Sequence, residues 1–144
     1  MIEITKYLQT VYEDLQRYVD NDVCLCKFKE LNFEAGALPD YEDINIQQLY
    51  LLRYAFAYAF EYSRMYLDVL SQMDGVNGIS VTSVGCGSMI DYWSLVHALE
   101  MKRKIDCSIR YVGIDKIDWS YKIPKRQNDE VHYLIGNAAD VFAH

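Results

Sequence analysis

The stretch VTSVGCGSMID, residues 81–91, decides which fold this sequence predicts. A β-branched run leads into two glycines one residue apart, Gly85 and Gly87, and a helix-like segment follows. Glycines at the end of a strand let the backbone approach a ligand closely, because they have no Cβ atom. Free backbone N–H groups at the start of the next helix favour an acidic or hydrogen-bond-accepting ligand. The stretch therefore predicts a ligand-binding turn.

The pattern around this turn is typical of alternating strands and helices. Residues 79–84 are short and β-branched, residues 89–104 are helix-like, and residues 108–114 form a second strand that ends at Asp115. Residues 130–135 are a third candidate strand and end at Gly136-Asn137. A strand, a helix and a strand within about 35 residues indicate a βαβ unit with parallel strands.

The first half of the chain has helical periodicity instead. Apolar residues recur at steps of three and four from Ile4 to Val19 and again over residues 45–73, and the second helix is nearly apolar all round near its middle. Between them, residues 22–44 are mixed and broken by glycine, proline and an acidic run. Gly75 and Asn77 end the long helix.

These patterns predict an α/β fold in one domain. A helical N-terminal region, residues 1–74, precedes a partial Rossmann-like parallel sheet of about three strands in βαβ units, residues 75–144. A chain of 144 residues with 51% hydrophobic content can bury one ordinary core.

Charge and cysteine content narrow the function classes. The net charge of −7 opposes non-specific binding to nucleic acid, and the basic cluster at residues 101–104 fits a solvated helix end. The four cysteines accompany no signal peptide and no membrane-spanning apolar run, so we expect reduced thiols and a cytoplasmic protein. Cys24-x-Cys26 is one residue short of a zinc knuckle, and we expect no metal site.

The glycine spacing weighs against a dinucleotide. A dinucleotide fingerprint reads Gly-x-Gly-x-x-Gly, and Ile90 stands where its third glycine would allow close packing of helix on strand. Asp115, at the end of the next strand, can accept hydrogen bonds from both hydroxyls of a ribose. A nicotinamide-dependent oxidoreductase is thus the least favoured of the enzyme classes considered.

At these residues the sequence resembles the class I S-adenosylmethionine-dependent methyltransferases. VTSVGCGSMID matches their first motif, with Met89 in place of its third glycine and Asp91 two positions later. YVGID matches the second motif and ends at Asp115, and HYLIGNAAD matches the third. The resemblance implies that S-adenosylmethionine or S-adenosylhomocysteine is bound by Gly85, Cys86, Gly87, Asp91, Asp115, Lys116, Asn137 and Asp140.

The resemblance implies methyl transfer by direct displacement, but it identifies neither the acceptor nor a catalytic residue. His97, His132 and His144 have no support as a base, and a nucleic acid enters only as a methyl acceptor. The alternative is a non-catalytic module of the same fold that serves binding or assembly.

Side chains of the long helix allow two interpretations. Tyr50, Tyr54, Tyr58, Tyr62 and Tyr66 recur every four residues and either stack on an adenine or substrate base or pack in the core. Arg53 and Arg64 either bind the cofactor carboxylate or form surface ion pairs.

The family comparison also predicts a partner. The fourth strand of the family's sheet is absent, which leaves the edge of the strand at residues 79–84 bare. We therefore expect either a homodimer or a missing C-terminal half.

Overall fold

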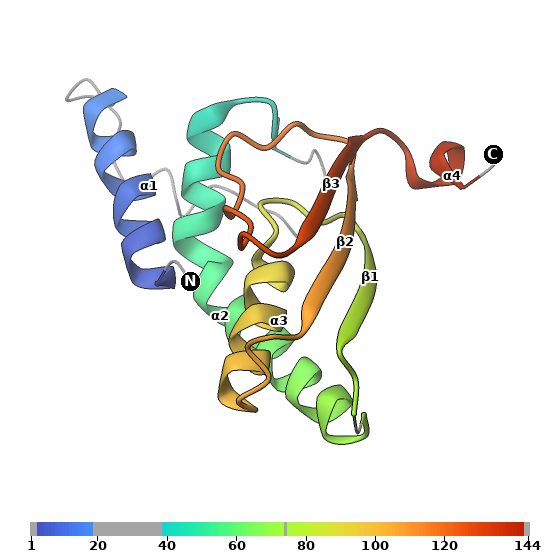
Figure 1. Cartoon of the computed structure of the whole chain (residues 1–144). Helices are drawn as coiled ribbons and strands as arrows, with labels where there is room; N and C mark the ends of the chain where they lie inside the picture. Colours follow the sequence, from blue (N-terminus) through green and yellow to red (C-terminus); the bar gives the residue numbers. More distant parts are fainter. Residues whose placement is uncertain (1–2, 19–38, 74, 143–144) are drawn as a thin grey trace.

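The computed structural model describes residues 3–18, 39–73 and 75–142 (Figure 1). Cys24, Cys26 and His144 lie outside the described residues, as does most of the mixed segment at residues 22–44. The elements are, in order, α1 (Ile4–Tyr18), α2 (Ile44–Ser71), β1 (Gly78–Val84), α3 (Ile90–Met101), β2 (Ser108–Asp115), β3 (Glu130–Ile135) and α4 (Ala138–Val141). Each helix and strand that the sequence predicts is present, with ends that differ by a few residues.

The three strands form a parallel sheet in the order β1-β2-β3, which confirms the α/β class. β1 and β2 are joined through α3 and make one βαβ unit. The second connection, residues 116–129, contains no helix, so the expected plural βαβ units are corrected to one in the described chain. Backbone groups of this connection bond elsewhere instead: the Ile123 N–H donates to the Ser88 carbonyl oxygen, and the Ser120 N–H donates to Gln47 of α2.

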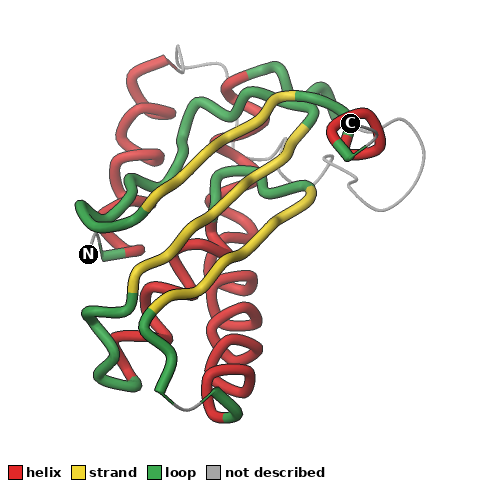
Figure 2. Tube along the Cα trace, turned by 45° about the vertical axis from the view of Figure 1, so that its right-hand side comes forward, coloured by secondary structure: helices red, strands yellow, loops and turns green. Residues whose placement is uncertain are grey.

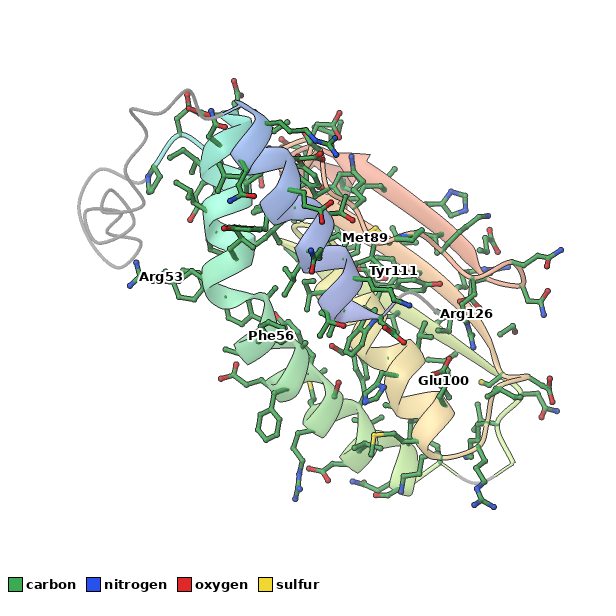
Figure 3. All side chains as sticks on the ribbon, turned by 90° about the vertical axis from the view of Figure 1, so that its left-hand side faces the viewer. Arg53, Phe56, Met89, Glu100, Tyr111 and Arg126 are labelled. Atoms are coloured by element: carbon green, nitrogen blue, oxygen red, sulfur yellow. The ribbon has the colours of Figure 1, made fainter. Side chains whose placement is uncertain are left out.

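The helices cover one face of the sheet. α3 lies against the strands, α2 packs along α3, and α1 packs on α2 (Figures 1 and 2). Because α3 is enclosed between α2 and the sheet, it is apolar on nearly every side and most of its residues are buried. α2 has one buried side, and Arg53 and Phe56 point away from the sheet (Figure 3). The nearly apolar middle of α2 therefore exposes Phe56 and Phe60.

No helix covers the other face of the sheet in the described part of the chain (Figure 2). Along β2, Ile109 and Tyr111 are buried on the helix side, whereas Ser108 and Arg110 are exposed. Arg110 donates to Glu130 of β3 at 2.8 Å on this exposed side. This alternation has the period of two that suits a half-covered sheet. None of the helices in the described part of the chain is both long and apolar enough to cross a bilayer.

Candidate functional site

A cavity of about 350 Å³ opens where β1 and β2 end, between the turn at residues 85–88 and α2. Its walls come from three parts of the chain: the turn with the start of α3, the segment after β2, and one side of α2 with Tyr41 before it. The lining residues are Tyr41, Tyr50, Leu51, Ala55, Tyr58, Tyr62, Ser83, Val84, Gly85, Cys86, Gly87, Ser88, Ile90, Asp91, Asp115, Ile117 and Trp119.

The turn has the left-handed backbone that its glycines suggest. The φ angles are +69° at Gly85 and +52° at Gly87, values that side chains disfavour. Met89 occupies the position of the third glycine in the methyltransferase motif that the sequence resembles, and the φ angle of Met89 is also +69°. Such a conformation costs a residue with a Cβ roughly 1–2 kcal/mol. Burial of the Met89 side chain in the core offsets that cost.

Asp115 ties the turn to the end of β2. Its two carboxylate oxygens accept from the backbone N–H of Gly87 at 2.8 Å and from that of Ile117 at 2.9 Å. The N–H groups of Gly85 and Cys86 donate to the Ile114 carbonyl oxygen. Several turn amides thus already have acceptors, which corrects the expectation that they are free for a ligand. A carboxylate has about four acceptor positions, so Asp115 retains capacity for ligand hydroxyls.

Asp91 lies in the same wall at the start of α3 and is only 7% exposed. The Tyr111 hydroxyl lies 2.9 Å and 3.0 Å from its two carboxylate oxygens. Burial raises the pKa of the Asp91 carboxyl, and hydrogen bonds from Ser83, Tyr111 and backbone N–H groups oppose that rise. The cavity therefore contains a buried carboxyl group whose hydrogen-bond donors are all neutral.

Cys86 is buried beside these carboxyl groups. Burial, with a smaller contribution from the charges of Asp115 and Asp91, raises the pKa of the Cys86 thiol to about 12. A thiol with that pKa is protonated at neutral pH and is a poor nucleophile. Cys86 therefore shapes the cavity, and Cys107, the other described cysteine, is also buried and unpaired.

Aromatic rings form the wall opposite the turn. Tyr50 contacts Tyr41 at 5.6 Å and Trp119 at 5.5 Å between ring centroids, and Tyr58 continues the row at 6.1 Å from Tyr50. The structure divides the tyrosine row: Tyr50, Tyr58 and Tyr62 line the cavity, whereas Tyr66 is buried in the core, and stacking on a base stays a prediction. Sequence reasoning missed Tyr41 and Trp119, whose only signal is their proximity to helix α2 and to Asp115 in the chain.

Three of the expected ligand residues lie outside the lining. Lys116 is exposed, and Asn137 and Asp140 belong to the segment after β3, which leads away from the end of the sheet (Figure 1). Asn137 accepts from the Ala139 N–H and caps α4. The structure brings together Gly85, Cys86, Gly87, Asp91 and Asp115.

The candidate arginines and histidines also lie elsewhere. Arg64 pairs with Asp68 at 3.6 Å, and Arg53 lies over the Tyr54 ring. His97 stacks on Trp93, and His132 contacts Glu130 on the sheet. The described lining has no histidine, lysine or arginine, and no group of three or more potential metal ligands occurs in the described residues.

Comparison of the chain with known protein families, with curated proteins and with solved structures found no match. The cavity itself therefore carries the functional argument.

Proposed function

We propose that this chain is the S-adenosylmethionine-binding part of a methyltransferase with a Rossmann-like sheet, and that the cofactor binds in the cavity beside the turn. One observation carries the proposal: Asp115 and the Gly85–Gly87 turn, far apart in sequence, meet in the cavity wall. The volume of about 350 Å³ lies within the range of small-molecule sites.

Each wall of the cavity has a part in binding. Asp115 accepts from the ribose hydroxyls while it keeps the turn in place. The rings of Tyr50 and Trp119 supply a surface on which an adenine can stack. The bound cofactor would supply an activated methyl group, and the chain's own residues would hold it and exclude water from it.

A module that binds the cofactor without transferring its methyl group is the second candidate. The described lining has no histidine or lysine, and its two carboxyl groups, Asp91 and Asp115, already accept hydrogen bonds from the protein, so neither is held free to take a proton from an acceptor.

Calorimetry with S-adenosylmethionine, S-adenosylhomocysteine and NAD tests the proposal. We expect heat of binding with a sulfur compound and none with NAD at the same concentration. Trp119 lines the cavity, so its fluorescence in a Trp93→Phe variant should change with the same dependence on ligand concentration. Binding of NAD, with no response to either sulfur compound, would reverse the assignment.

A further inference from the structure

The charge of the cavity wall has one sign. Asp91 and Asp115 are its only titratable carboxyl groups, and the described lining contains no lysine, arginine or histidine. No ion pair with either carboxylate occurs among the described residues, whose ion pairs all involve other acids. A buried carboxylate without a cation is unfavourable, so a ligand that brings a positive charge gains most from the buried Asp91 and less from the half-buried Asp115.

A second observation points to a ligand in the same place. Trp119 is 6% exposed and lines the cavity, and its indole Nε1–H has no acceptor within the described protein. A buried donor without an acceptor is costly, and a bound molecule that offers an acceptor removes that cost. Within the described residues, the indole N–H is therefore left for an acceptor on a bound ligand.

The aromatic wall adds to the preference for a cation. The faces of Tyr41, Tyr50, Tyr58 and Trp119 carry the negative part of the ring quadrupole. Cations without N–H groups, such as sulfonium and quaternary ammonium ions, bind to such faces without the need for hydrogen-bond acceptors. A phosphate group is disfavoured in the same place, because the Asp115 carboxylate already accepts from the Gly87 amide and the Ile114 carbonyl oxygen accepts from the Gly85 and Cys86 amides.

We propose that this cavity selects the positively charged sulfonium of S-adenosylmethionine over the neutral thioether of S-adenosylhomocysteine, with Asp91 as the specificity-determining residue. The inference rests on the proposed function and adds to it a preference for one of the two sulfur compounds. S-adenosylmethionine differs from its thioether product by one methyl group and one positive charge. The change in the ratio of their affinities when the charge of Asp91 is removed therefore measures the electrostatic contribution of that residue.

Calorimetry at low ionic strength tests this in the intact chain and in two variants. We expect the unaltered protein to bind S-adenosylmethionine about tenfold more tightly than S-adenosylhomocysteine. Asp91→Asn removes the charge and keeps the side-chain size, so the affinity for S-adenosylmethionine should fall more than that for S-adenosylhomocysteine and the ratio should fall toward one. Asp118→Asn is the matched control, because Asp118 is exposed and pairs with Lys122, and it should leave the ratio unchanged.

A second measurement needs no variant. The preference for the sulfonium should decline as the pH falls through the raised pKa of Asp91, since protonation removes the charge. The other titratable groups facing Asp91 are Tyr62 and Tyr66 of α2, Tyr111 of β2 and Cys86 of the turn, and all have raised pKa values. They stay neutral over this range, and Asp115 is the only other acid in the wall.

The outcomes separate the two claims. Equal affinities for the two sulfur compounds in the unaltered protein would overturn the charge selection and leave the binding function standing. Asp91→Asn weakening both compounds to the same extent would show a merely structural role for Asp91 and also overturn it. Failure of both compounds to bind would remove the proposed function and this inference together.

Discussion

Asp115 combines two tasks that mutation can separate. It accepts from the backbone N–H groups of Gly87 and Ile117, and the proposed cofactor would use its remaining acceptor capacity. Asp115→Ala should therefore weaken S-adenosylmethionine binding by roughly 2–4 kcal/mol, and Asp115→Asn by less, because the amide retains one acceptor oxygen. Calorimetry measures this loss of binding free energy.

Thermal unfolding of the same variants measures how much Asp115 contributes to the stability of the fold. Two partly buried N–H groups lose their acceptor in Asp115→Ala, so its unfolding temperature should fall below that of the unaltered chain. Asp118→Ala, in the same connection but exposed, is the control and should change neither quantity. An Asp115→Ala variant with unaltered affinity would remove Asp115 from the site.

Gly113 is a position where one methyl group has no room. A Cβ atom there would lie 2.7 Å from the Cys86 sulfur and 2.9 Å from a ring carbon of Tyr111. Gly113→Ala should reduce the free energy of unfolding by about 1–3 kcal/mol, because both neighbours are buried. Chemical denaturation measures the loss.

The clash at Gly113 also predicts a partial rescue. Adding Cys86→Ala to Gly113→Ala removes the sulfur but leaves the Tyr111 contact, so part of the lost stability should return. The control is Cys86→Ala alone. Strictly additive losses in the double variant would contradict the contact.

Sequence patterns predicted the wall of the cavity that contains the turn and Asp115, but not the aromatic wall opposite it. Gly85 and Gly87 mark a turn in any strand-to-helix junction, and Asp115 follows a visible strand, so their meeting follows from parallel pairing. Tyr41 and Trp119 lie in segments without periodicity, and only tertiary packing brings them to the cavity. Asn137 was expected there by resemblance, but it begins a short helix that leads elsewhere.

At the scale of elements, an ion pair between the buried Asp129 carboxylate and the partly buried Arg126 anchors the connection between β2 and β3. The Asp129 carboxylate accepts from Arg126 Nε and Nη2 at 2.8 Å each, from the Tyr92 hydroxyl at 2.6 Å and from the Ile109 N–H at 3.0 Å. Arg126 also donates to the Cys107 carbonyl oxygen at 2.8 Å. These bonds hold the end of a connection without a helix against α3 and β2.

The Asp129 cluster predicts a pH dependence of stability. Burial acts to raise the pKa of Asp129, but hydrogen bonds from Arg126, Tyr92 and Ile109 outweigh it and hold that pKa below its usual range. Because the folded pKa is depressed, this contribution is complete above the unfolded pKa of about 3.9 and is lost as the pH falls through the folded value. Unfolding temperatures measured from about pH 7 to pH 2 follow the loss.

Two variants isolate this contribution. Asp129→Ala leaves Arg126 without its partner and should cost about 3–5 kcal/mol at neutral pH. Asp129→Asn should lower stability at neutral pH and flatten the acid decline, whereas Glu130→Gln, in an exposed pair, should do little. An unchanged acid decline in Asp129→Asn would assign the effect to other groups.

Periodicity predicted most of the elements because α1 is amphipathic over its whole length and β1 is rich in β-branched residues. The run from Ile4 and the long run over residues 45–73 became α1 and α2, since their apolar sides face each other and α3. The connection at residues 116–129 has no such period, and its path is set by single bonds such as that from the Tyr133 hydroxyl to the Ile117 carbonyl oxygen. Patterns of apolar residues contain no information on such bonds.

At the scale of the molecule, one layer of helices covers one face of a small sheet. The opposite face presents polar Thr82, Arg110 and His132 to solvent, and it also exposes apolar Val84 and Leu134 near the carboxyl ends of β1 and β3. The resemblance to the methyltransferase sheet, whose fourth strand is absent here, predicted an unpaired edge at β1. In the described residues β1 pairs only with β2 (Figure 2). The outer backbone groups of β1 therefore have no strand partner within the described chain.

That edge favours self-association. Unpaired N–H and C=O groups along a seven-residue strand are a template for another strand, and a two-fold contact would use the same edge of both copies. We propose a homodimer through β1, with at least about 1,000 Å² buried in total. Sedimentation or light scattering should then give twice the chain mass of 16.8 kDa at micromolar concentration.

A lysine introduced on β1 tests whether the dimer forms through this strand or through another surface. Thr82 is exposed on β1, so Thr82→Lys places two like charges near each other in a two-fold pairing and should shift the protein toward monomer. Thr10→Lys adds the same charge on the exposed side of α1, remote from the sheet edge, and should leave the mass unchanged. A monomer in the unaltered protein would refute the dimer. A dimer that persists in Thr82→Lys would show that the contact lies on another surface. The first surface to test would then be that around Phe56 and Phe60, because these are the most exposed large apolar side chains of α2.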